Sequence, residues 1–410
     1  MIQSPPPHPA EGRAPIAMGE FVPLVAALMA LGALGVDAML PALPVMGAEL
    51  HAPGVNAPQF VITVYLLGLG VGQLIHGPLS DAIGRRPVML AALAVYAVAG
   101  LAAAASTSFA VLLVMRFAGA VAVAATRVVT VATVRDCYSG RPMARVMSLA
   151  SMVFMIAPVL APTLGQGVLF FGSWRLIFGV IAALTLVVMA WYWRRLPETL
   201  APVDRLPLSI ARTWLGARQT LGNRWSLGYM LAATGLQGAL LGYVTSVQPI
   251  VTGVFHAAPR LTIVFALTAG AMAAANLVNS RFVLRLGSRI LSQGALVALI
   301  LAATVALMAA TTGHEGLAVF VVLQAVAMGC FSLANANFSA LAMVDMGAIA
   351  GTASSVQGFV TVTVGALIGA LIGQSYAGST VPLHLGFLLA GLFAFATVAV
   401  TERGRLFHPG

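Results

Sequence analysis

The chain has 410 residues, of which 60% are hydrophobic and only 8% charged, and its mean hydropathy is +0.98. This balance excludes a water-soluble globular protein and indicates a polytopic membrane protein. The formal net charge is +10, and all 21 basic residues are arginines. Because these arginines fall in short connections between apolar runs, they indicate membrane topology and not nucleic-acid binding.

The N-terminal stretch 1–18 is rich in proline and shows no apolar periodicity, so a disordered tail is expected there. The first apolar run, 21–43, is long enough to cross a bilayer, which takes about 20 residues. We therefore expect this run to be retained as a membrane helix and not removed as a signal peptide.

Further apolar runs of spanning length follow, and with the first they predict twelve membrane helices. The later runs are 56–76, 87–105, 109–131, 146–170, 176–193, 226–251, 261–284, 290–311, 317–343, 351–374 and 383–400. The two cysteines, Cys137 and Cys330, fall in different halves of the chain and are expected to be free thiols.

Arginines gather in alternate connections, while the other connections carry almost none beyond Arg175 and Arg260. The positive-inside rule makes the arginine-rich side, with both termini, cytoplasmic. The connections on this side carry Arg85 and Arg86, then Arg135, Arg141 and Arg145, then the arginines of 194–224, then Arg281, Arg285 and Arg289.

One long polar connection, 194–224, separates the predicted halves 19–193 and 225–400, and a short tail, 401–410, ends the chain. The Pro and Arg content of this connection indicates a surface linker with a short amphipathic helix on the inner leaflet. Gly287 and Arg289 stand in the second half as Gly84 and Arg86 stand in the first. The predicted fold is an all-α polytopic membrane protein with two six-helix halves around a central cavity.

The stretch 77–86, GPLSDAIGRR, is a dense cluster of charges and helix breakers between two apolar runs. Gly77 and Gly84 allow a sharp turn, and Asp81, Arg85 and Arg86 form an electrostatic latch. The pattern Gly-x-x-x-Asp-x-x-Gly-Arg-Arg resembles the signature loop between the second and third helices of the major facilitator superfamily. We predict that Arg85 approaches Asp136 in the fourth span, with Asp81 near the inner end of the eleventh, when the halves close on the cytoplasmic side.

Other stretches resemble particular branches of this superfamily. APVLAPTLG, 157–165, resembles the motif of its drug and proton antiporters, and Pro158, Pro162 and Gly165 would form a hinge there. VDAMLPALP (36–44), VRDCYSGRP (134–142), SWRLIFG (173–179) and LPET (196–199) resemble the Bcr/CflA and phenicol-exporter branch. The resemblance implies proton-coupled drug efflux in the inner membrane of a bacterium.

Asp37 is the only carboxylate well inside a predicted span, and such residues usually mark an ion or substrate path. The alternative is an aspartate at a helix end whose side chain reaches outward. Arg116 and Arg127 lie eleven residues apart in the fourth span, which predicts one face of the helix about 16 Å apart. Their depths favour Arg116 as the partner of Asp37 in proton coupling. Arg116 also matches the arginine of proton-driven members, although Gly119 and Ala120 replace their usual Gln-Gly.

Arg127 has two interpretations: a structural arginine or interdomain latch near the inner end, or a charge that favours anionic or zwitterionic substrates. A mostly apolar, sparsely polar cavity is expected between the halves, although each of its candidates could instead serve packing. The candidate substrate-binding residues are Asp37, Tyr65, Arg127, Met152, Phe154, Met155, Tyr243, Gln248, Asn276, Asn335, Phe338 and Gln357.

Enzyme functions find no support, because the seven histidines are scattered singly and the chain has no lysine for a phosphate-binding loop. No metal, ATP or other cofactor is implied. A channel would need a ring of polar pore-lining residues, and a sensor would need an attached soluble domain; the sequence indicates neither. We expect a monomeric, proton-driven exporter of small amphipathic compounds that works by alternating access. An exporter of an endogenous metabolite or sugar with the same fold is the alternative.

Overall fold

The computed structural model describes residues 15–138 and 140–408, apart from the side chains at 140, 141, 144, 148, 150–159, 210, 212, 213, 284 and 348. Every regular element in these ranges is helical. The α-helices are α1 (Met18–Asp37), α2 (Leu43–Glu49), α3 (Phe60–Ile83), α4 (Arg85–Ala104), α5 (Phe109–Val123), α6 (Ala125–Cys137), α7 (Gly140–Phe171), α8 (Arg175–Arg195), α9 (Ile210–Gly222), α10 (Arg224–Pro249), α11 (Leu261–Thr311), α12 (Leu317–Ala342), α13 (Ala350–Gln374) and α14 (Val381–Thr401). Shorter turns are η1 (Leu40–Ala42), η2 (Ala57–Gln59), η3 (Pro202–Asp204), η4 (Ile250–Val254), η5 (Ala258–Arg260) and η6 (Gly347–Ile349).

Within the described ranges, 11 helical segments are long and apolar enough to cross a membrane. The 32-residue α7 is the twelfth long helix. Two spans are joined in α11, which bends at Gly287 into two arms. The all-helical, twelve-span fold predicted from the sequence is confirmed.

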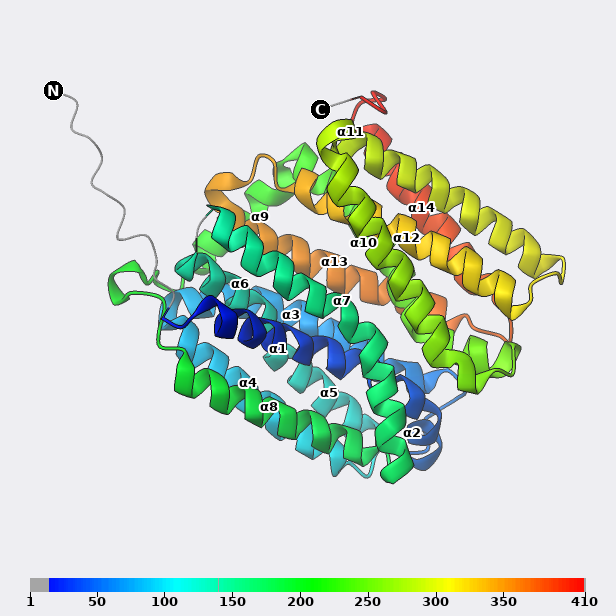
Figure 1. Cartoon of the computed structure of the whole chain (residues 1–410), viewed down its shortest axis with the longest axis horizontal. Helices are drawn as coiled ribbons and strands as arrows, with labels where there is room; N and C mark the ends of the chain where they lie inside the picture. The colour runs from blue at the N-terminus through cyan, green and yellow to red at the C-terminus, as the bar shows by residue number, and fades with distance from the viewer. Residues whose placement is uncertain (1–14, 139, 409–410) are drawn as a thin grey trace.

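The helices form two bundles, one of α1 to α8 and one of α10 to α14, which lie side by side (Figure 1). They meet mainly where α3 packs against α13 and α7 against the first arm of α11. The connecting helix α9 packs on α13, where Gly216 contacts Thr352, while Trp214 and Leu215 are exposed. An exposed apolar face of this kind fits a helix lying at a membrane surface.

The two bundles repeat one local arrangement at the turn before α4 and at the bend of α11. Gly84 has φ 117° and ψ 159°, and Gly287 has φ 81° and ψ 155°, a conformation that side-chain-bearing residues rarely adopt. Glu198 accepts hydrogen bonds from the backbone N–H groups of Arg85 and Arg86, at 2.9 and 3.1 Å. In the second half Glu402 binds the Nε of Arg289 at 2.9 Å, so each bundle anchors this turn with a carboxylate that follows its last helix.

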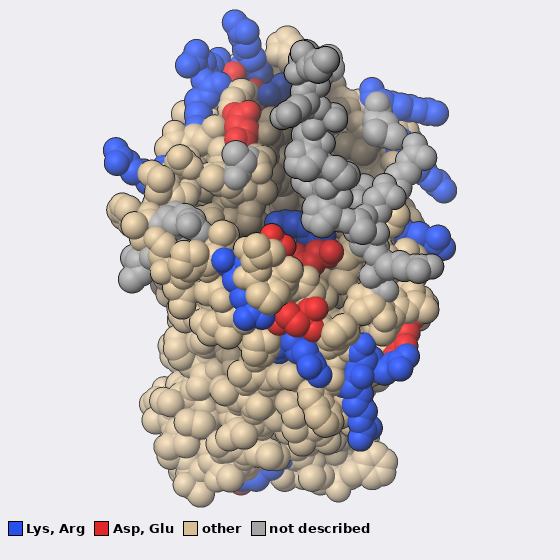
Figure 2. All heavy atoms as spheres, turned by 90° about the vertical axis from the view of Figure 1, so that its left-hand side faces the viewer, with Lys and Arg blue, Asp and Glu red and all other residues tan. Residues whose placement is uncertain are grey.

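The two ends of the molecule differ in charge and in closure. Figure 2 shows arginine side chains spread over the end from which α1 starts and at which α9 lies, called here the arginine-rich end. At the opposite end, hydrogen bonds join the halves: the Asn56 amide donates to the carbonyls of Gln374 and Tyr376 at 3.0 and 2.9 Å. The Thr262 hydroxyl donates to the side chain of Gln166 at 3.0 Å. The halves are therefore tied together at the opposite end.

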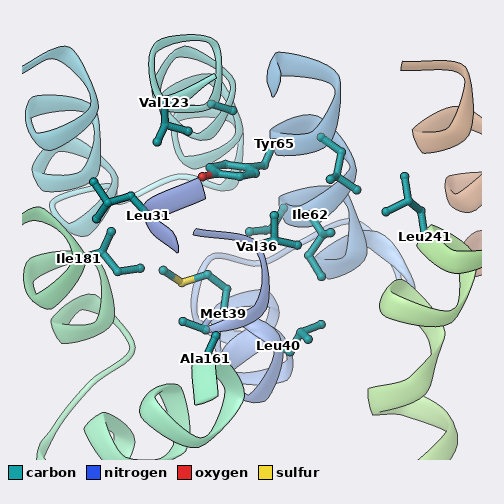
Figure 3. Packing of buried hydrophobic residues seen from close by; sticks show 14 of the residues in the cluster. Leu31, Val36, Met39, Leu40, Ile62, Tyr65, Val123, Ala161, Ile181 and Leu241 are labelled. Carbon is teal, nitrogen blue, oxygen red and sulfur yellow. The ribbon is translucent and has the colours of Figure 1, made fainter. Parts of the chain in front are cut away.

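Close packing between α1 and α7 depends on Gly165. A methyl group at this position would lie 2.1 Å from the carbonyl oxygen of Ala38, at the end of α1. The surrounding core includes Met39 and Leu40, which are fully buried, and Ala161 of α7 (Figure 3). A side chain at position 165 would therefore push apart the helices that enclose this part of the core.

We expect Gly165→Ala to lower the free energy of unfolding by about 1–3 kcal/mol, because the added methyl group overpacks this contact. Thermal unfolding of the detergent-solubilised protein, followed by tryptophan fluorescence, measures the effect. Gly167→Ala is the matched control, since a methyl group there meets no atom within 4 Å. Equal unfolding midpoints for the two variants would show that the close contact is not needed.

Candidate functional site

The first membrane span is interrupted at Asp37, where α1 ends and the chain turns before η1 and α2. Pro41 and Pro44 lie in the first turns of η1 and α2. Proline has no N–H, so Pro41 cannot donate the helical hydrogen bond to the carbonyl of Asp37. The last carbonyls of α1 consequently need other donors.

Arg116 of α5 supplies one of these donors. Its Nη2 donates to the carbonyl of Gly35 at 2.7 Å, and its Nε donates to the carbonyl of Val61 at 3.3 Å. Its guanidinium carbon lies 4.0 Å from the centre of the Tyr65 ring, and the residue is buried. A buried cation beside the C-terminal carbonyls of a helix is favoured by the helix dipole and by cation–π attraction.

Two tyrosines complete this cluster. The Tyr65 hydroxyl donates to the carbonyl of Gly32 at 3.2 Å and lies 3.2 Å from the Tyr96 hydroxyl. Both hydroxyls occupy the space beside Gly35, where a methyl group would lie 2.1 Å from one and 2.5 Å from the other. Figure 3 shows the Tyr65 ring reaching from α3 toward α1. Tyr65 is therefore a fully buried part of this network, and it lines neither of the two larger cavities described below.

Asp37 is buried, with 6% of its surface exposed, and among the described residues its carboxylate has no hydrogen-bond or ion-pair partner. The predicted ion pair with Arg116 is absent. Gly35 faces the tyrosines, and Asp37, two residues later, lies about 200° around the helix, so it faces away from Arg116. Asp37 lies within electrostatic range of Tyr243 in the second half as well as Tyr65 in the first.

The fourth span, Phe109–Cys137, contains α5 and α6, which join at Ala124 with helical backbone angles of φ −55° and ψ −27°. Its two arginines, predicted to share one face, have different surroundings. Arg116 is buried against α1, whereas Arg127 is exposed and lines two neighbouring cavities between the halves. In the described part of the chain, the Arg127 side chain makes no hydrogen bond or ion pair.

Cavity A, of about 200 Å³, lies between α3, α6 and the start of α13. It reaches Asp81 and the exposed Arg135, so it extends to the arginine-rich end. Cavity B, of about 240 Å³, continues between Arg127 and helices α10, α12 and α13. The two cavities share Gln73 and Ser354 as well as Arg127.

Cavity B combines amide and hydroxyl groups with aromatic rings, and Arg127 is its only charged residue among those described. The predicted residues Asn335, Phe338 and Gln357 line it. Gln357 also donates hydrogen bonds to the Ser226 hydroxyl at 2.8 Å and to the carbonyl of Ala342 at 3.1 Å. Apart from Arg127, this surface is uncharged and partly aromatic, which suits an amphipathic molecule.

Other predicted cavity residues lie elsewhere. Asp37 lines neither cavity A nor cavity B. Tyr243 is buried and its hydroxyl lies 3.0 Å from that of Thr268. Gln248 is buried near the opposite end, and Asn276 is half-buried on α11 outside both linings. Met152, Phe154, Met155 and Pro158 have side chains outside the described set, whereas Pro162 is described and buried.

The predicted contact of Arg85 with Asp136 is present, with Nε and Oδ2 3.1 Å apart. Arg85 also pairs with Asp81 at 2.5 Å, and Arg86 donates to the carbonyl of Trp193 at 2.6 Å. All of these groups belong to the first half, so the Arg85–Asp136 pair does not by itself join the halves. Asp81 lines cavity A together with the first turn of α13, the eleventh span. Its approach to that span when the halves close stays a prediction.

Sequence reasoning missed Gln73, Gln237, Tyr96 and Glu198. Gln73 and Gln237 are amides inside predicted spans, the same signal that selected Gln357, and both line cavity B. Tyr96 lies in an otherwise apolar span, where a hydroxyl needs a partner. Glu198 lies in the LPET stretch, although nothing in the sequence pointed to the backbone N–H groups that it binds.

No group of three or more potential metal-ligating side chains occurs among the residues searched, which are the described ones. Instead, two membrane-spanning bundles enclose polar cavities at their interface. This architecture defines a secondary transporter.

Comparison with known proteins agrees, since residues 25–373 match the Major Facilitator Superfamily. The chain belongs to this superfamily of transporters and is not an enzyme.

Its relatives include proteins named for drug resistance. It is 30% identical to a bicyclomycin resistance protein homolog of Haemophilus influenzae over 88% of this chain and 91% of the relative. It is 29% identical to the uncharacterized MFS-type transporter YdgK of Bacillus subtilis over 92% of this chain and 94% of the relative. A chloramphenicol resistance protein of Pseudomonas aeruginosa is 40% identical over 41% and 40% of the two chains.

Among solved structures, the human organic anion transporter MFSD10 (TETRAN) superposes with a TM-score of 0.63 at 18% identity, over 92% of this chain and all of that one. This similarity shows the fold alone. The chain is a multi-pass membrane protein with bacterial homologues, related to drug-resistance exporters.

We expect Arg116→Met to lower the free energy of unfolding by about 1–3 kcal/mol, because it leaves the buried carbonyl of Gly35 without its donor. Thermal unfolding in detergent measures the change. Tyr96→Phe is the control within the same cluster and should cost less, since its contact with the Leu31 carbonyl is long, at 3.4 Å. An Arg116→Met variant as stable as the wild type would contradict a supporting role at the end of α1.

Proposed function

We propose that the protein exports small amphipathic compounds, including drugs, in exchange for protons by alternating access. Two relatives are named for resistance to bicyclomycin and chloramphenicol, and a multidrug transporter MdfA of Yersinia pestis is 32% identical over 52% of both chains. The amide, hydroxyl and aromatic groups that line cavity B beside Arg127 support an amphipathic substrate. The expected partners are thus a small molecule, protons and the lipid bilayer, with no cofactor beyond the proton gradient.

The observation that carries proton coupling is Asp37, a buried carboxylate without a partner at the interruption of the first span. A carboxylate in this environment binds and releases a proton as its surroundings change. Arg116 contributes by holding the end of α1 in place and not by pairing with Asp37. In this proposal Asp37 exchanges the proton, while Arg116 is a positioning residue.

Alternating access is supported by the difference between the two ends. Hydrogen bonds from Asn56 to Gln374 and Tyr376 join the halves at the opposite end, while cavity A reaches the arginine-rich end. Rocking of the halves would break the first set of contacts and close the cavity. In the closed arrangement Asp81 would meet the N-terminus of α13, where a carboxylate is favoured by the helix dipole. The stretch 77–86, which the structure shows as the last turns of α3, a sharp turn at Gly84 alone and the start of α4, would then act as the latch. Pro162 and Gly165 would form part of a hinge.

The arginine distribution supports an orientation in which the arginine-rich end and both termini are cytoplasmic. The bacterial relatives support a location in the inner membrane of a bacterium. We propose that the halves are 19–193 and 225–400, joined by the linker 194–224, with end segments 1–18 and 401–410. One chain holds both halves and the cavities between them, so a monomer is sufficient for transport.

Expression in a pump-deficient bacterial strain should raise the tolerated concentration of chloramphenicol or bicyclomycin, and Asp37→Asn should abolish the gain. The substitution keeps the size of the side chain but removes the group that binds the proton. Growth inhibition measures resistance, and substrate uptake into everted vesicles, driven by an imposed pH gradient, measures coupling.

Asp204→Asn is the matched control, because Asp204 is exposed in η3. Efflux that Asp37→Asn leaves intact would remove Asp37 from the coupling mechanism. If the wild type transports neither drug but exports a metabolite or sugar, the drug assignment is wrong and the alternative holds.

Arg127 should disfavour cationic substrates, because its unpaired charge faces cavities A and B. We expect Arg127→Gln to bind a lipophilic cation about fivefold or more tightly than the wild type, with little change for a neutral compound of matched shape. Binding to the purified protein, followed by tryptophan fluorescence, measures both affinities. Arg218→Gln on α9 controls for the loss of net charge, and equal cation binding by all three proteins would make Arg127 structural.

A further inference from the structure

A wide apolar groove lies on the second half, between the two arms of α11, with α12 as its floor. In Figure 1, α12 is visible between these arms, which join at the bend. The groove has a volume of about 820 Å³, and its lining is aliphatic apart from the thiol of Cys330. Val278, Val322 and Val326 in its walls are 45%, 61% and 47% exposed. In a membrane-spanning bundle, this surface faces lipid.

The length of the groove along its helices matches the thickness of a single lipid leaflet. Its walls extend over 271–278 and 290–298 of α11 and over 322–333 of α12. At 1.5 Å per residue these stretches are about 10 to 16 Å long. The hydrocarbon of one leaflet is about 15 Å deep, half of the bilayer core. An extended acyl chain can therefore lie along the groove.

Two arginines continue the same wall toward the arginine-rich end. Ala271, Ala274 and Val278 line the groove, and Arg281 and Arg285 follow on the same helical face, three and seven residues after Val278. Arg281 thus lies about 4.5 Å beyond Val278 along the axis. Both arginines are exposed, and in the described part of the chain neither has a hydrogen-bond or ion-pair partner.

We propose that this groove binds one acyl chain of an anionic phospholipid, whose phosphate group is held by Arg281 and Arg285. The neighbouring Arg289 is different, since Glu402 already neutralises it at 2.9 Å. Two unpaired guanidinium groups directly above an apolar groove match the charge and shape of such a lipid, and guanidinium binds phosphate in a bidentate manner. A second copy of the chain fits less well, because a twofold axis through the groove would bring four like charges together.

Cys330 provides a probe inside the groove. The other cysteine, Cys137, is buried, so Cys137→Ser leaves a single thiol in the full-length protein. The rate of alkylation of this thiol by N-ethylmaleimide, followed by intact-protein mass spectrometry, reports whether the groove is covered. Mixed micelles with phosphatidylglycerol or with phosphatidylcholine of the same acyl chains are then compared. We expect half-maximal protection at a roughly 30-fold lower fraction of phosphatidylglycerol, from the attraction of two arginines.

The double variant Arg281→Gln, Arg285→Gln should remove the preference for phosphatidylglycerol. The control double variant Arg403→Gln, Arg405→Gln should keep it, because it alters two exposed arginines away from the groove. Equal protection by both lipids, or a preference that survives in the first variant, would overturn the proposal. Protection that rises with protein concentration in lipid-free micelles would identify a second copy as the occupant and also overturn it. None of these outcomes depends on which compound is exported.

Discussion

The first half is organised around the contact of the Arg116 guanidinium with the broken end of α1. α1 ends at Asp37, ahead of Pro41, which leaves buried carbonyl groups without helical donors inside the membrane span. Arg116 donates a hydrogen bond to one of these carbonyls, that of Gly35. Tyr65 and Tyr96 can pack beside the same residue because Gly35 has no side chain. Asp37 can then face the other half from the end of α1 without leaving the buried carbonyl of Gly35 unpaired.

Much of the fold could be predicted from the sequence, since spans longer than about 20 apolar residues and the alternation of arginines are local properties. The turn at Gly84 and the bend at Gly287 could also be predicted, because both glycines adopt positive φ and the charges near them need partners. The turn is shorter than expected, since α3 continues through Gly77 and Pro78 to Ile83. The Arg85–Asp136 contact could be anticipated for this reason. Side chains such as Asn335 and Gln357 were recognisable as polar groups within apolar spans.

The pairing inside the membrane could not be predicted in the same way. Depth along a straight helix placed Asp37 and Arg116 at one level, but depth says nothing about the direction in which each side chain points. A backbone carbonyl at the end of α1 accepts the hydrogen bond of the Arg116 guanidinium in place of the Asp37 carboxylate. Arg127, on the same span, instead lines the cavities between the halves. These surroundings depend on how several helices pack together, which no single stretch of sequence records.

Asp37 lies outside the linings of both cavities, so the group proposed to carry the proton and the surface proposed to hold the substrate are separate. On this basis, coupling passes through the movement of the halves and does not require the two cargoes to compete for one carboxylate. Changes in the cavity wall can then alter which compounds are accepted while leaving the energy source intact. If the protein exports drugs as proposed, single substitutions in the cavity wall could widen the range of exported compounds without rebuilding the machinery that drives export.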